Sequence, residues 1–112
     1  MSVMIAERQL SANGTPLLIR VFQPRMDDSS TGTWACDYEV TGADLNLSAA
    51  MYGVDSYQAL MLTMQIIPSF IETSEAFKAG KITWLDRQLT DDSSDPFSIE
   101  QVFALKALGR KQ

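Results

Sequence analysis

The chain has 112 residues, of which 46% are hydrophobic and 21% charged, values typical of a folded globular protein. A chain of this length builds one core, so we expect a single domain over residues 1–112. Fourteen acidic and nine basic residues give a net charge of −5, with no histidine and one cysteine. This composition argues against histidine-based catalysis, a disulfide framework, zinc sites built from paired cysteines and broad electrostatic binding to nucleic acid.

The N-terminal sequence and the single cysteine predict a compartment. Residues 1–8 lack the basic leader and long apolar stretch of a secretory signal peptide. No apolar run approaches the ~18 residues that a membrane span needs. Cys36 has no second cysteine to pair with and no basic neighbour to lower its pKa. We therefore expect a cytoplasmic protein that does not bind membranes, with Cys36 in the core.

The first half of the chain predicts four strands. Asn13 and Gly14 can take the positive φ angles of a tight hairpin turn between the first two strands. Residues 23–32 form a long polar connection, and the later strands alternate apolar and polar residues. The short links favour an antiparallel meander with one buried face. The expected strands cover residues 3–10, 16–22, 33–41 and 45–52.

A long helix is expected after the strands, from Ser56 to about Ala79. Asp55 is a good N-cap, and Gly80 suits the C-terminal end. The apolar surface of this helix is wider than the ~100° stripe that contact with a sheet requires, so the helix needs cover on more than one side. Pro68 interrupts the pattern and is expected to kink the helix or to divide it near Ile67.

The remaining chain is expected to form a short extended segment at residues 81–85, an acidic loop at residues 86–95 and a C-terminal helix from about Pro96 or Ser98 to Leu108. We favour this last helix as the second cover of the long helix, with a homodimer as the alternative. The covering side chains would be Ile99, Val102, Phe103 and Leu105.

Together these elements predict an α+β fold. A four-stranded antiparallel meander packs on one long Pro-kinked helix, and a short extended segment and a C-terminal helix follow.

Residues 53–60 read Gly-Val-Asp-Ser-Tyr-Gln-Ala-Leu. With the segments 34–42 and 82–85, this motif resembles a small bacterial family, a domain of unknown function with a G-V-D-x-x-Q-A-L motif. The likeness runs over most of residues 15–86. It implies no catalytic residue, so the motif is interpreted structurally: Gly53 permits a turn and Asp55 caps the helix, while Gln58 faces solvent or the end of the sheet.

The acidic residues are unevenly distributed. Residues 98–112 carry three basic and one acidic side chain, which leaves six basic and thirteen acidic residues, a net charge of −7, in the rest of the chain. An acidic surface either keeps a protein soluble or attracts a basic partner. On the second interpretation the candidate partner-binding residues are, in order, Asp91, Asp92, Asp95, Asp27, Asp28, Asp37 and Glu39.

Asp37 and Glu39 project from the same side of one strand. Such residues lie ~7 Å apart, a spacing compatible with acid–base chemistry. An open antiparallel face, however, offers no pocket to shift their pKa values. We favour cross-strand pairing with Arg8 or Arg20, and we expect neither enzyme activity nor a cofactor or metal.

These observations predict a non-enzymatic inhibitor that binds a basic toxin or effector and occludes its active site, as a bacterial immunity protein or antitoxin does. We expect a monomer, with a homodimer through the long apolar helix as the alternative. A second candidate function is a dimeric secretion chaperone or adaptor, which would self-associate through the apolar helix and hold client peptides on the sheet.

Overall fold

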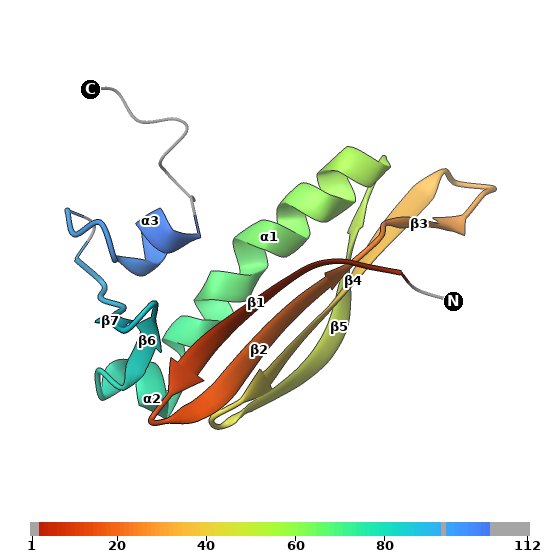
Figure 1. Cartoon of the computed structure of the whole chain (residues 1–112). Helices are drawn as coiled ribbons and strands as arrows, with labels where there is room; N and C mark the ends of the chain where they lie inside the picture. Colours follow the sequence, from red (N-terminus) through yellow and green to blue (C-terminus); the bar gives the residue numbers. More distant parts are fainter. Residues whose placement is uncertain (1–2, 93, 104–112) are drawn as a thin grey trace.

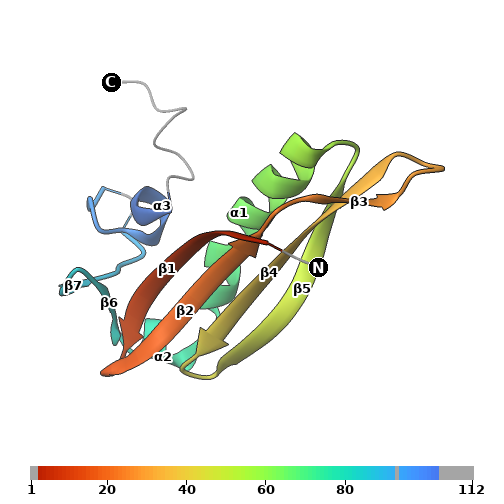
Figure 2. The same cartoon turned by 45° about the vertical axis from the view of Figure 1, so that its right-hand side comes forward.

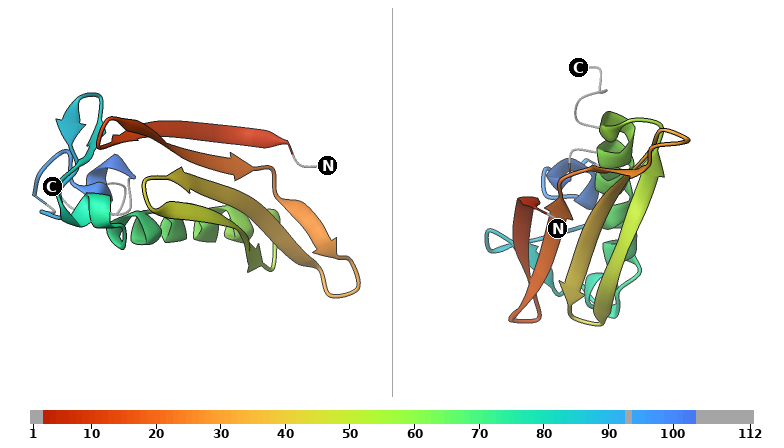
Figure 3. Two further views of the ribbon diagram at one scale, coloured as in Figure 1. Left: turned by 90° about the horizontal axis from the view of Figure 1, so that it is seen from below. Right: turned by 90° about the vertical axis from the view of Figure 1, so that its right-hand side faces the viewer.

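The computed structural model describes residues 3–92 and 94–103, which form an antiparallel sheet with one long helix against one face (Figures 1 and 3). The strands are β1 (Met4–Ala12), β2 (Thr15–Phe22), β3 (Arg25–Asp28), β4 (Thr33–Gly42), β5 (Leu45–Gly53), β6 (Ile82–Trp84) and β7 (Arg87–Gln88). The helices are α1 (Ser56–Glu72), α2 (Glu75–Lys78) and α3 (Ile99–Val102). No helix in the described ranges is long and apolar enough to cross a membrane.

The sheet is built around β4. One edge of β4 pairs with β5 along its whole length, and the other edge pairs first with β3 and then with β2. β1 pairs with β2, β6 pairs with the end of β1, and β7 pairs with β6. All of these pairings are antiparallel, and α1 lies against β4 and β5. Figure 3 shows the resulting two layers, with the opposite face of the sheet left open.

The predicted fold class is wrong. The described residues form a mostly antiparallel sheet of seven strands, not a four-stranded meander on a long helix, and α1 has only 17 residues. β3 and β7 come from segments interpreted as polar loops. β3 forms because β4 extends beyond the end of β2, so that Arg25 and Met26 pair with Ala35 and Trp34.

The helix ends seven residues earlier than predicted because of two hydroxyl side chains. Thr73 Oγ1 donates to the carbonyl of Phe70 at 2.6 Å, and Ser74 Oγ donates to that of Ile71 at 2.7 Å. Ser74 Oγ also accepts a hydrogen bond from the backbone of Phe77 at 3.1 Å, which caps α2. Such side chains compete with the helical backbone for hydrogen bonds and so favour helix ends.

α1 continues through Pro68, which is buried. The predicted C-terminal helix is present as α3 in the described residues. Residues 104–108 of that prediction, with Leu105, lie outside them.

Two tight turns set the register of the long strands. Asn13 (φ 53°) and Gly14 (φ 85°) confirm the predicted hairpin between β1 and β2. The turn between β4 and β5 also has two residues, and its Ala43 has φ 53°. Gly42 has φ 130°, and a Cβ there would collide with the carbonyl oxygen of Pro16. Only glycine adopts this positive φ angle without strain and has no Cβ to collide with Pro16.

The core lies between α1 and the sheet. Cys36, Tyr38 and Val40 of β4 are buried, as their alternation predicts, and the rings of Tyr38 and Phe70 stack with centroids 6.4 Å apart. The fully buried residues of the core include Leu10, Leu17, Ile71, Ile82, Leu89 and Ile99.

Candidate functional site

The open face of the sheet carries an ion-paired network across β1, β2 and β4. Arg20 Nε donates to Glu7 Oε2 at 2.7 Å, and Arg20 Nη1 lies 3.9 Å from Glu39 Oε1. The hydrogen bond with Glu7 raises the pKa of Arg20. The predicted pairing of Glu39 with Arg20 is therefore present.

A second network lies where β3 joins this face. Arg25 donates from Nε and Nη2 to both oxygens of Asp37, at 2.9 and 3.2 Å, and from Nη1 to Asp27 Oδ1 at 2.9 Å. The hydrogen bonds to Asp37 and Asp27 raise the pKa of Arg25. Across both networks, four carboxylates against two guanidiniums leave a charge of −2 on the open face.

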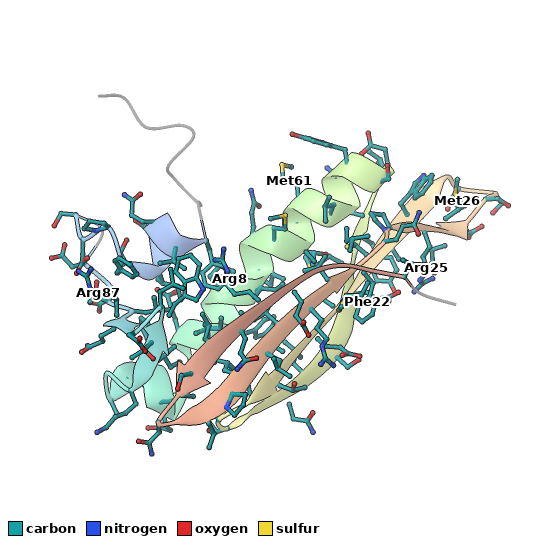
Figure 4. The ribbon with its side chains drawn as sticks, in the orientation of Figure 1. Arg8, Phe22, Arg25, Met26, Met61 and Arg87 are labelled. Carbon is teal, nitrogen blue, oxygen red and sulfur yellow. The ribbon has the colours of Figure 1, made fainter. Side chains whose placement is uncertain are left out.

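Arg8, the other predicted partner, lies on the opposite face of the sheet (Figure 4). Its guanidinium sits 4.3 Å from the ring centroid of Trp84 and 5.4 Å from that of Phe103. Nη1 donates to the carbonyl of Val102 at 2.8 Å. Burial lowers the pKa of Arg8. Arg8 thus ties β1 to β6 and to the chain around α3.

Asp28 lies at the tip of the arm formed by β3 and β4. Its Oδ1 accepts hydrogen bonds from the backbone N–H of Ser30 at 3.0 Å and from the hydroxyl of Ser30 at 2.7 Å. These hydrogen bonds lower the pKa of Asp28. This side chain organises a turn.

Asp92 makes the same turn in the acidic loop. Its Oδ1 accepts from the N–H and the hydroxyl of Ser94 at 3.0 and 2.7 Å, which lowers the pKa of Asp92. Asp95 Oδ1 accepts from the backbone of Phe97 at 2.8 Å. In both Asp-Asp-Ser-Ser strings, the second aspartate therefore accepts the same pair of hydrogen bonds from the last serine.

The structure does not bring the seven candidate residues together. Asp27 and Asp28 lie at one end of the molecule, Asp37 and Glu39 on the open face, and Asp91, Asp92 and Asp95 at the other end, beyond β7 (Figures 1 and 2). The longest dimension of the molecule is 45 Å.

The end that holds residues 91–95 is the more acidic one. Residues 72–100 contain seven of the fourteen acidic residues and three basic ones, a net charge of −4. One of the three, Arg87, stacks 4.5 Å from the ring centroid of Phe97. The carboxylate of Asp44 joins this end by accepting a hydrogen bond from the backbone of Glu75 at 3.3 Å. We call residues 72–100 the acidic end.

An apolar groove lies on the helix side of the sheet, at residues that were not predicted to form a site. It has a volume of about 240 Å³. Met64, which is 54% exposed, forms part of its rim. The wide apolar surface of α1 indicated that part of this helix needs cover. Only the fold shows that β1 and β2 form the other side of the groove. The lining residues are Ala6, Glu7, Arg8, Ile19, Val21, Met64, Ile67, Val102 and Phe103.

The predicted second cover leaves the long helix partly open in the described residues. Val102 and Phe103 line one side of this groove and Met64 and Ile67 another, and Met64 is 54% exposed. In residues 3–92 and 94–103, no group of three or more carboxylate or thiol side chains is placed to hold a metal ion.

The fold and side chains define a small, mostly antiparallel sheet protein with an ion-paired open face and one acidic end. The model of the family described as Domain of unknown function (DUF6968) matches residues 6–93, so the chain belongs to this family and the resemblance to a domain of unknown function is confirmed. No curated protein and no solved structure matches the chain.

Proposed function

We propose that this protein binds a basic protein through its acidic end and inhibits it by occlusion, as an immunity protein or antitoxin does. The observation that carries the proposal is the concentration of half of all acidic residues in residues 72–100, with a net charge of −4. A surface of one sign attracts a partner of the opposite sign, speeds its encounter and selects against acidic proteins.

The local geometry of the acidic loop supports this role. Asp92 and Asp95 are fixed by hydrogen bonds to the backbone of Ser94 and Phe97. A loop held in one conformation loses little entropy when it binds, so its carboxylates are preorganised for a partner. On the open face, by contrast, Asp37 and Glu39 lie beside Arg25 and Arg20.

The test reverses one charge at each end of the molecule. Asp91→Lys changes the acidic end and leaves Asp92 to hold its turn, and Asp27→Lys makes the same change of charge beside the matching turn of Asp28. The basic partner is captured with the wild-type protein from its native cells, identified by mass spectrometry and purified for calorimetry. We expect Asp91→Lys to raise the Kd about tenfold and to flatten its dependence on salt. Asp27→Lys should leave the Kd unchanged.

Two results would contradict the proposal. An unchanged Kd for Asp91→Lys removes the loop from the interface. A captured partner that is itself acidic removes the electrostatic argument altogether.

The apolar groove favours a second candidate, the secretion chaperone or adaptor. A client segment with apolar side chains would bury them against Met64, Ile67 and Val21. Met64→Asp should then abolish capture of the client, whereas Asp91→Lys should not affect it. The opposite pattern favours the inhibitor.

A further inference from the structure

The strand β5 forms one edge of the sheet and pairs only with β4 among the described strands. It is nine residues long and contains neither a charged residue nor a proline. Exposed edges of this kind are templates for pairing with another strand, and proteins normally block them with lysines, prolines, bulges or short strands.

The other edges of the sheet carry such blocks. β3 has four residues, three of them charged, and an irregular register between Met26 and Asp28. β7 has two residues, one of which is Arg87. The part of β1 that extends beyond β6 carries Glu7 and Arg8 and a register shift between Met4 and Ala6. Among the described strands, only β5 has a long and unblocked edge.

The phase of the ladder shows which backbone groups β5 offers. A two-residue turn makes the flanking residues Gly42 and Leu45 a hydrogen-bonded pair. Odd-numbered residues of β5 therefore bond to β4, and even-numbered residues direct their N–H and C=O groups to the open edge. These residues are Asn46, Ser48, Ala50 and Tyr52.

The charge distribution indicates what can pair there. Residues 45–71, which cover β5 and nearly all of α1, contain one charged residue, Asp55, although an average density of 21% would place five or six in such a stretch. A basic partner gains nothing from this surface. Two copies of a chain with net charge −5, on the other hand, repel each other least where charges are missing.

We propose that a second copy of this chain pairs through β5, antiparallel and centred on Ser48. On the helix side, Leu45 would lie opposite Met51 of the partner subunit, and Leu47 opposite Ala49 of the partner subunit. Asp44 would lie opposite Tyr52 of the partner subunit, so that no carboxylate faces another. The two sheets join into one, which removes both open edges.

The flank of α1 nearest to β5 fits this arrangement. Met64 faces the groove beside β1 and β2, and at 100° per residue Leu62 and Ile66 lie on the opposite flank, toward β5. Both are half-buried and uncharged. They would approach the same residues of the partner subunit, while the groove and the acidic end stay open. This dimer differs from the expected monomer and from a dimer built on the apolar helix alone.

The experiment measures the mass of the purified protein by light scattering after size exclusion, from micromolar to submillimolar concentration. We expect a particle of twice 12.4 kDa for the wild-type protein. Ser48→Pro removes an N–H that faces the open edge and leaves the bonds to β4 intact, so it should give a folded monomer. Ser48→Ala, the matched control, keeps the N–H and should remain a dimer.

Each other outcome overturns the proposal. A wild-type monomer over the whole range excludes the dimer. A dimer that persists in Ser48→Pro but dissociates in Met61→Lys assigns the interface to the exposed face of α1. If Ser48→Pro does not fold, Ser48→Lys replaces it. Within one subunit this lysine faces Glu39, which should let the variant fold. Across the interface the lysine faces the same lysine of the second copy, and the repulsion should dissociate the dimer. No basic partner is needed, so the result is separate from the test of the proposed function.

Discussion

Asp28 and Asp92 show how single side chains set the conformation of both ends of the molecule. Each is the second residue of an Asp-Asp-Ser-Ser string, and each accepts two hydrogen bonds from the serine two positions later. Carboxylates that accept such bonds are stabilised in the charged form, so their pKa values fall. The sequence predicted polar turns here.

We expect Ser94→Ala to raise the pKa of Asp92 toward its usual value, because the hydroxyl that lowers it is removed. Ser30→Ala should do the same to Asp28 and leave Asp92 unchanged, so each variant is the control of the other. Titration of the carboxyl carbons by NMR measures both groups. The native pKa values lie below those of the unfolded chain, so the stabilisation is present above the unfolded pKa and lost as the pH falls through the native one.

The start of α1 shows how an element is defined by a short motif. Asp55 Oδ1 accepts from the backbone of Gln58 at 2.8 Å, and Gln58 Oε1 accepts from the backbone of Val54 at 2.8 Å. This is a reciprocal arrangement like a capping box. Gly53 is needed for a different reason than expected, because a Cβ there would lie 2.6 Å from the nitrogen of Ala59. The motif thus closes the junction of β5 and α1.

We expect Asp55→Ala to lower the free energy of unfolding by about 1 kcal/mol, the usual cost of losing an N-cap. Gln58→Ala should cost less, and the double variant should cost less than the sum, because the two side chains support each other. Denaturant unfolding of the three variants measures these energies. Strict additivity would show that the two hydrogen bonds act independently.

At the scale of elements, the sequence predicted the features that depend only on neighbouring residues. The alternation of β4, the Asn13-Gly14 turn and the Asp55 cap were all found as expected. β3 was not predicted because its residues are polar. Its pairing with the first part of β4 becomes evident only when the whole sheet is assembled. The end of α1 was misplaced because the hydroxyls of Thr73 and Ser74 outweigh a continuing apolar pattern.

At the scale of the whole molecule, charge and apolar surface are separated in space. The acidic end includes β6 and β7, which lie at one edge of the sheet, while the uncharged β5 forms the opposite edge. The sequence predicted an acidic protein and the pairing of Glu39 with Arg20, but not that Arg25 binds both Asp37 and Asp27 at the open face. Nor could it predict the groove, since its lining comes from β1, β2, α1 and the residues around α3. Residues so distant in sequence are brought together only by the complete fold.

Arg8 of β1 contacts Trp84 of β6 and the chain around α3. We therefore expect its replacement to destabilise the packing of all three segments. We expect Arg8→Met to lower the free energy of unfolding by about 1–2 kcal/mol, from the loss of the contacts with Trp84 and Phe103 and of the bond to Val102. Arg20→Met, which removes an exposed ion pair, should cost less. Thermal unfolding gives both values. Equal losses would mean that Arg8 contributes nothing beyond an exposed charge.

The burial of Cys36 has a practical consequence. The thiol is inaccessible at the interface of β4 and α1, and burial raises its pKa, so we expect its reaction with electrophilic thiol reagents to be slow in the native state. Because the chain has one cysteine, labelling reports only those openings, local or global, that expose Cys36. The modification rate under native conditions thus gives the free energy of the opening that exposes Cys36, without an introduced probe.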